Sequence, residues 1–223
     1  MDIKENTVSA KNQMRNLSEL SFLGNETAPI KILILGNSIT RHAPAPEVGW
    51  FGDWGMSASA PENDYVHRLY AKLTENGFDV FMRIRQASFW ERNFLKEDIL
   101  SYYNEERDFQ ADVVIFRLGE NVISEDAPYF KEALKKLMSH VSERGKAVYT
   151  TSFWKSSTVD EAILSVAKER GEICLDGGLS KDETNMAIGQ FEHRGVSVHP
   201  NDKGMEAYAN LLFESLKVMI AKL

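Results

Sequence analysis

Short aliphatic runs that end in glycine, separated by segments of helical periodicity, constrain the fold of this chain more than any other feature. The run KILILG at residues 31–36 is typical of a strand buried on both faces, and residues 112–118, followed by Gly119, repeat the pattern. Further strands are predicted at 79–84, 146–153 and 173–175, and helices at 64–76, 94–103, 127–144, 159–170 and 205–223. Strands that alternate with helices in this way predict right-handed crossovers and a parallel sheet covered on both faces.

The length and charge of the chain limit the class of protein further. Its 223 residues suit one domain, which we place at residues 30–223, preceded by a polar N-terminal arm at residues 1–29. The net charge of −7 and the absence of a Lys/Arg run argue against nucleic acid or a membrane as partner. The single Cys174 excludes an intramolecular disulfide and a cysteine zinc cage.

The same survey indicates the compartment and the cofactors to expect. No apolar run is long enough to span a bilayer, and the first 20 residues lack the apolar core of a signal peptide. The default expectation is therefore a cytoplasmic protein, although a secreted chain trimmed of its leader would look the same. The histidines are scattered and no acidic loop is present, so we expect neither a metal nor another cofactor.

Three polar residues fall where a parallel sheet places its ligands, at the carboxyl ends of strands. Ser38 follows the first strand, Asn121 follows the strand at 112–118, and His199 precedes the last helix. A serine, a histidine and an asparagine on one rim could supply a nucleophile, a general base and an oxyanion donor. The alternative is that these residues have no catalytic role: Ser38 caps a helix, and Asn121 and His199 are loop residues.

These segments resemble the SGNH hydrolases, also called GDSL esterases. The string GNSIT at 36–40 is similar to block I of that family, LGEN at 118–121 to block III, and VHPN at 198–201 to block V, in the family's order. The resemblance implies a three-layer α/β/α domain with a flavodoxin-like parallel sheet of about five strands. It also implies a serine hydrolase of carboxylic esters, with Ser38 as nucleophile and oxyanion donor, Asn121 as a second donor and His199 as base.

Two positions depart from the family pattern. Glu91 falls at the glycine of block II, so its N–H would be the third oxyanion donor and Arg92 the local partner of its carboxylate. Val196 stands where the family has the aspartate that orients the histidine. Three alternatives follow: a backbone carbonyl orients His199, which we favour; a carboxylate such as Glu192 or Asp202 substitutes; or the site is catalytically weak.

Aromatic residues and a long loop suggest the substrate. His42, Trp50, Trp54 and Trp90 are candidates for the substrate pocket, although tryptophans more often pack a loop onto a sheet. A rim with several tryptophans suits O-acetyl esters of carbohydrates, with a short-chain lipid or acyl-thioester as the nearest alternative. The segment 37–63 is expected to shape the leaving-group pocket and to act as a lid.

A competing class is a carbohydrate-binding module on the same fold, with weak turnover or none. Val196 and Glu91 are the residues that favour it. The oligomeric state stays open.

Overall fold

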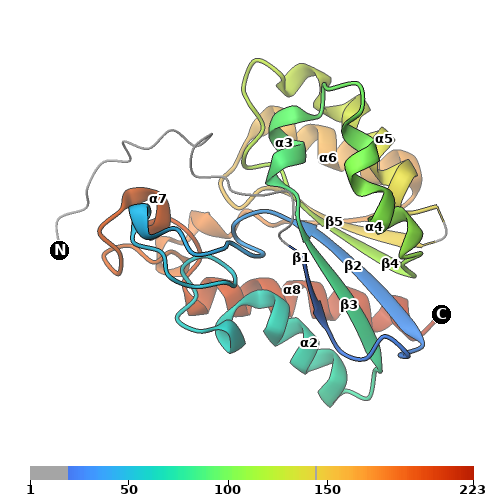
Figure 1. Cartoon of the computed structure of the whole chain (residues 1–223), viewed down its shortest axis with the longest axis horizontal. Coiled ribbons are helices and arrows are strands. Elements are labelled where there is room, and N and C mark those ends of the chain that lie inside the picture. The colour runs from blue at the N-terminus through green and yellow to red at the C-terminus, as the bar shows by residue number, and fades with distance from the viewer. Residues whose placement is uncertain (1–19, 144) are drawn as a thin grey trace.

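The computed structural model describes residues 20–143 and 145–223, which form a six-stranded sheet with helices on both faces (Figure 1). The strands are β1 (Leu20–Leu23), β2 (Ile30–Gly36), β3 (Val80–Gln86), β4 (Val113–Arg117), β5 (Lys146–Thr150) and β6 (Ile173–Leu175). Their order across the sheet is β1-β3-β2-β4-β5-β6, and all neighbours are parallel except β1 and β3. The five parallel strands follow the flavodoxin-like order.

The helices divide between the two faces of the sheet (Figure 1). One face carries α2 (Tyr65–Glu75) and α8 (Asp202–Ile220), and the other carries α3 (Ser88–Asn93), α4 (Asn104–Asp108), α5 (Phe130–Val141) and α6 (Ser157–Arg170). The short helix α7 (Arg194–Ser197) lies just before α8. Single 3₁₀ turns lie at Pro46–Val48, Pro61–Asn63, Ile99–Tyr103, Ala127–Tyr129, Leu179–Lys181 and Glu183–Asn185.

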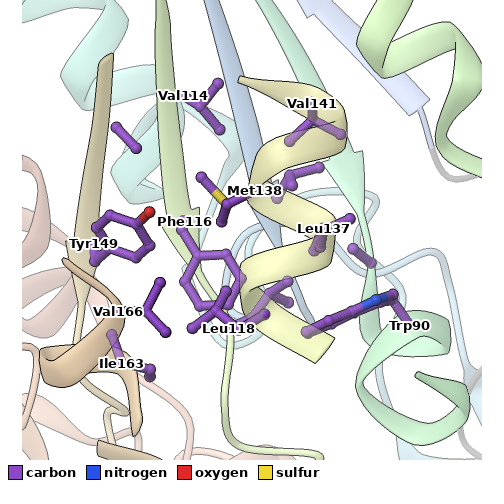
Figure 2. Packing of buried hydrophobic residues seen from close by; sticks show 14 of the residues in the cluster. Trp90, Val114, Phe116, Leu118, Leu137, Met138, Val141, Tyr149, Ile163 and Val166 are labelled. Carbon is purple, nitrogen blue, oxygen red and sulfur yellow. The ribbon is translucent and has the colours of Figure 1, made fainter. Parts of the chain in front are cut away.

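Alternating residues of the central strand build the two halves of the core. In β2, Leu33 and Leu35 join the cluster under α3, α5 and α6, whereas Ile32 and Ile34 join the cluster under α2 and α8. Figure 2 shows the first cluster, in which Phe116 packs between Tyr149 and Trp90. Because both faces of the strand are covered, a continuous aliphatic run is what the fold requires.

This architecture confirms the predicted three-layer α/β/α fold with five parallel strands, and it adds a sixth strand. Residues 20–23, which the sequence predicts to belong to an N-terminal arm, form β1 and pair with β3, so the sheet begins before residue 30. Residues 1–19 of the predicted arm lie outside the described residues.

The predicted helix at 94–103 is wrong. Helix α3 begins at Ser88, two residues after β3 ends, and a 3₁₀ turn and α4 follow it. The apolar pair Trp90 and Phe94, four residues apart, packs on Phe130 of α5 and therefore sets the helix earlier in the chain.

Candidate active site

Ser38 and His199, 161 residues apart in the sequence, meet at the carboxyl end of the sheet. The Oγ of Ser38 lies 2.8 Å from Nε2 of His199, which is hydrogen-bond distance. Ser38 belongs to the turn after β2, and His199 belongs to the link between α7 and α8. The structure therefore brings together the two residues that the sequence motifs propose as nucleophile and base.

A backbone carbonyl orients His199. Its Nδ1 lies 2.5 Å from the carbonyl oxygen of Gly195 in α7. The His199 N–H donates to Val196 O instead, so the Gly195 carbonyl at the end of this one-turn helix can accept from the imidazole. With the proton on Nδ1, Nε2 presents its lone pair to Ser38. Of the three alternatives, this geometry matches the backbone orienter.

Val196 stands where the SGNH family has an aspartate, and its apolar side chain packs in a buried cluster. Val196 is buried in a cluster with Trp50 and Met56, and its carbonyl accepts the hydroxyl of Ser57 at 2.6 Å. The Asp202 carboxylate accepts both the N–H and the hydroxyl of Ser59. Neither Asp202 nor Glu192 holds Nδ1 of His199, which is directed to Gly195.

Burial is the main influence on the charge of His199. Desolvation lowers the pKa of its imidazole to about 3; the Gly195 carbonyl acts in the opposite direction, and His42, Arg117 and His193 lower it further. His199 is therefore neutral at physiological pH, which is the state in which Nε2 can accept a proton.

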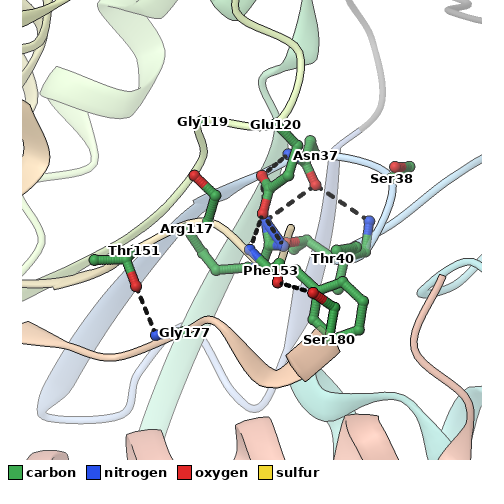
Figure 3. Close-up of polar contacts among 12 residues, drawn as sticks. Asn37, Ser38, Thr40, Arg117, Gly119, Glu120, Thr151, Phe153, Gly177 and Ser180 are labelled. Carbon is green, nitrogen blue, oxygen red and sulfur yellow. Dashed lines mark hydrogen bonds and ion pairs between the residues drawn. The ribbon is translucent and has the colours of Figure 1, made fainter. Parts of the chain in front are cut away.

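A buried ion pair supports the turn that carries Ser38 (Figure 3). Arg117, at the end of β4, makes two hydrogen bonds to Glu120, of 2.7 and 2.9 Å. The Asn37 amide joins this pair, since Nδ2 donates to Glu120 at 2.6 Å and Oδ1 accepts from Arg117 at 3.2 Å. The same Oδ1 accepts the N–H of Ile39, which closes the turn around Ser38.

Two hydrogen-bond donors border the site, the Ser38 N–H and the Asn121 amide. Within the described part of the chain, the Ser38 N–H donates to no protein acceptor, so it is available to an oxyanion. Asn121, in the loop after β4, lines the same cavity as Ser38. One of its amide hydrogens is engaged with Glu91, and the second is available to a substrate.

The predicted oxyanion role of the Glu91 N–H is wrong. Glu91 lies inside α3, where its N–H donates to the carbonyl of Ala87. Of the residues of α3, Ser88 and Arg92 line the cavity and Glu91 does not. The Glu91 side chain points inward and is buried; burial, followed by the charge of Glu120, raises the pKa of its carboxyl, against the N–H groups of Gly119 and Asn121.

A small cavity of about 90 Å³ lies over Ser38 and His199. Of the predicted pocket residues, His42 lines it. Several other residues line it that are not among the predicted pocket residues: Met56, Gln86, Ser88, Arg92, Glu120 and Trp154. Trp154 packs edge-on to the His199 ring, with 5.0 Å between the ring centroids.

The other three tryptophans lie outside this cavity, which corrects their assignment to the pocket. Trp90 is fully buried and packs against Phe94, Phe116 and Phe130. Trp50 and Trp54 pack edge-to-face and anchor the segment 37–63, with their indole N–H groups bonded to carbonyls of that segment. The packing role is therefore the one the structure shows for all three.

The segment 37–63 contributes to the cavity through His42 and Met56. It is tied to the C-terminal part of the chain by Ser57 and Ser59, whose contacts are given above. Its predicted action as a lid stays a prediction.

No metal cluster and no membrane helix emerge from the described ranges 20–143 and 145–223. Within them, no three His, Cys, Asp or Glu side chains are grouped to hold a metal ion. No helix in the same ranges combines the length and apolar character needed to cross a membrane.

Solved structures share the fold of this chain at low sequence identity. Neither a protein-family model nor a curated protein sequence matches the chain. Among solved structures, the esterase EstA from Pseudoalteromonas sp. is 14% identical, with a TM-score of 0.56 over 86% of this chain and 98% of the other. A family two carbohydrate esterase from Cellvibrio japonicus is 16% identical, with a TM-score of 0.53 over 87% of this chain and 62% of the other.

A third similar structure is a protein from Slackia heliotrinireducens that has been proposed as an SGNH hydrolase. It is 16% identical, with a TM-score of 0.52 over 84% of this chain and 98% of the other. At these identities the likeness concerns the fold. The strand order, the helix layers and these neighbours together show that the chain has the fold of the SGNH hydrolases.

Proposed function

We propose that this protein is a serine hydrolase that cleaves short-chain carboxylic esters through an acyl-enzyme on Ser38. The observation that carries the proposal is the pair of contacts made by His199, 2.8 Å from Nε2 to Ser38 Oγ and 2.5 Å from Nδ1 to Gly195 O. A serine hydroxyl next to an oriented neutral imidazole is the arrangement that nucleophilic acyl transfer requires.

The reaction follows from these positions. His199 Nε2 takes the proton as Ser38 Oγ attacks the ester carbonyl carbon, and the Ser38 N–H and the Asn121 amide donate to the oxyanion. Collapse of this intermediate breaks the bond to the alcohol, which leaves with the proton from His199. Water then attacks the acyl-enzyme, with His199 again as base, and the carboxylic acid and free Ser38 result.

The size of the cavity supports a small acyl group. Its volume of about 90 Å³ is well below the roughly 300–1,000 Å³ of pockets for drug-sized ligands. A space of this size has room for an acetyl group, whereas most of a long acyl chain would have to extend beyond it. We therefore place acetyl esters first among the candidate substrates, ahead of the lipid and acyl-thioester alternatives.

We propose that the alcohol of the ester substrate is a hydroxyl group of a carbohydrate. Trp154 lines the cavity next to His199, and an indole face suits the apolar face of a sugar ring. The neighbour from Cellvibrio japonicus is a carbohydrate esterase, which supports the same choice. The competing binding module loses part of its support, since Trp50, Trp54 and Trp90 do not line this cavity.

Initial rates on 4-nitrophenyl acetate, butyrate and octanoate, and on an O-acetylated oligosaccharide, test the proposal. We expect Ser38→Ala and His199→Ala each to lower kcat by about 10⁴-fold or more. Acetate should exceed octanoate in kcat/KM by at least about tenfold, because the cavity cannot hold the longer chain. Ser101→Ala, at an exposed serine, is the matched control and should keep the wild-type rate. Full activity in Ser38→Ala, or a preference for octanoate, would contradict the proposal.

A further inference from the structure

Glu91 is a buried carboxylate that points at the loop carrying Asn121. Its exposed fraction is 0%, and its two oxygens accept hydrogen bonds from several groups. Oε1 accepts the N–H of Gly119 at 2.6 Å and the N–H of Asn121 at 3.2 Å, and Oε2 accepts Nδ2 of Asn121 at 2.7 Å. The carboxylate therefore holds both the backbone and the side chain of the loop after β4.

The neighbouring residue Arg92 contacts the other end of the same amide. Nη2 of its guanidinium donates to Oδ1 of Asn121 at 3.0 Å. The Asn121 side chain thus lies between an acceptor on its Nδ2 side and a donor on its Oδ1 side. An amide that turned over would set its oxygen against the Glu91 carboxylate and its NH₂ against the guanidinium, so this pair of neighbours selects one of the two amide orientations.

We infer that the Glu91 and Arg92 side chains form a clamp that fixes the orientation of the Asn121 amide beside the Ser38 site. Glu91 and Arg92 are then positioning residues, since Glu91 acts on the oxyanion through Asn121 and has no exposed surface toward a substrate. This role rests on the ester hydrolysis proposed above. It gives the carboxylate at the expected glycine position a function that its backbone N–H, bonded inside α3, does not have.

Replacing Glu91 with glutamine is the sharpest change, because it keeps the shape and alters only the hydrogen-bonding pattern. A glutamine offers one acceptor and one donor where the carboxylate offers two acceptors. An NH₂ group in place of Oε1 faces the N–H groups of Gly119 and Asn121, and one in place of Oε2 faces Nδ2 of Asn121. In both cases it also faces Nδ2 of Asn37, which lies 3.3 and 3.4 Å from the two oxygens. In the second case the Asn121 amide turns over and meets the Arg92 guanidinium with its own NH₂.

The test is a double-mutant cycle on 4-nitrophenyl acetate, with kcat and KM measured separately. We expect Glu91→Gln to lower kcat by about ten- to a hundredfold, less than or equal to the loss of one oxyanion donor, with KM changed by less than about threefold. In an Asn121→Ala background the same substitution should change kcat by less than about twofold, since the amide on which it acts is gone. Equal losses in both backgrounds would overturn the clamp, because they would indicate a general disturbance of the site.

Variants of Arg92 provide a second test of the clamp if Glu91→Gln does not fold. Arg92→Met removes the donor to Oδ1 and should lower kcat about tenfold with Asn121 present. In Asn121→Ala the loss should be much smaller, because only the direct effect of this cavity-lining side chain on the substrate remains. Arg92→Lys retains a cationic donor and should recover part of the loss. If Arg92→Met lowers kcat equally in both backgrounds, the clamp is wrong.

A matched control and the wild type separate this inference from the proposed function. Glu97→Gln makes the same chemical change at an exposed carboxylate beyond α3 and should leave kcat unchanged. A wild-type protein that neither hydrolyses the ester nor reacts with a fluorophosphonate at Ser38 would overturn the proposed function and the clamp together. An active, reactive wild type whose Glu91→Gln and Arg92→Met variants keep full kcat would overturn the clamp alone.

Discussion

The Gly195 carbonyl orients His199 and so replaces the missing carboxylate only in part. The Gly195 carbonyl can fix the tautomer of the imidazole, as an aspartate would, because it accepts the Nδ1 proton. It carries no full charge, so it stabilises the imidazolium of the intermediate less than a carboxylate does. Val196 occupies the aspartate position because its side chain packs with Trp50 and Met56.

The depressed pKa of His199 predicts an unusual acid limb in the pH–rate profile. An unfolded histidine titrates near 6.5, whereas burial lowers the pKa of His199 in the folded protein to about 3. The neutral base is therefore retained as pH falls through 6.5 and is lost only as pH approaches 3. We expect kcat/KM on an acetate ester to stay level from pH 8 to about pH 5.

Circular dichroism at each pH must accompany this profile, because folding favours the neutral imidazole. The stabilising contribution of neutral His199 is present above pH 6.5 and declines as pH falls toward 3, while the unfolded chain takes up the proton. A fall in kcat/KM with a midpoint near 6.5 in protein that remains folded would contradict the account of His199.

The tryptophans illustrate what single residues in a sequence do and do not reveal. Trp90 and Phe94 stand four residues apart, a spacing that indicates a buried helix face, and Trp90 is indeed core. Trp154 was missed, although it follows the strand at 146–150 and so lies at the carboxyl end of the sheet, where ligands bind. Composition alone cannot tell which tryptophan points toward the cavity.

At the scale of elements, burial on both faces made two of the strands plain in the sequence. β2 and β4 are covered on both faces, so their sequences are unbroken aliphatic runs that identify them. β1 has four residues at the edge of the sheet and lacks such a run, because one side of it meets solvent. Helix α3 has only six residues, and tertiary packing of Trp90 holds it in place.

The contacts of β1 predict that this edge strand stabilises the fold. Phe22 in β1 stacks on Phe81 in β3 with 5.4 Å between ring centroids, and the Arg83 guanidinium lies 5.3 Å from the Phe22 ring. We expect Phe22→Ala to lower the free energy of unfolding by about 1–2 kcal/mol. Urea denaturation followed by circular dichroism measures this change.

Phe51→Ala is the matched control for the edge strand. Phe51 is 73% exposed, against 46% for Phe22, and its replacement should change the free energy of unfolding by less than about 0.5 kcal/mol. If the two variants unfold at the same urea concentration, residues 20–23 contribute nothing to the sheet and the account of β1 is wrong.

At the scale of the molecule, the candidate site is assembled from the turn after β2, the start of α3, the loop after β4 and the link between α7 and α8. The order of the motifs was enough to predict that Ser38, Asn121 and His199 would lie at one edge of the sheet, since parallel strands align their carboxyl ends. The inward carboxylate of Glu91 could not be predicted, because its direction depends on where α3 begins. The sequence favours a backbone carbonyl as the partner of His199 but does not identify Gly195, because no side chain marks that carbonyl.

The central claim is that His199 activates Ser38 without a carboxylate, and the most direct measurement is intact mass after treatment with a fluorophosphonate. Such a probe forms a bond to an activated serine and releases fluoride. We predict one adduct on the wild-type protein, located on Ser38 by peptide mapping, and none on Ser38→Ala or His199→Ala in the same time. A folded wild-type protein that gains no adduct, or an adduct that persists in Ser38→Ala, would contradict the claim.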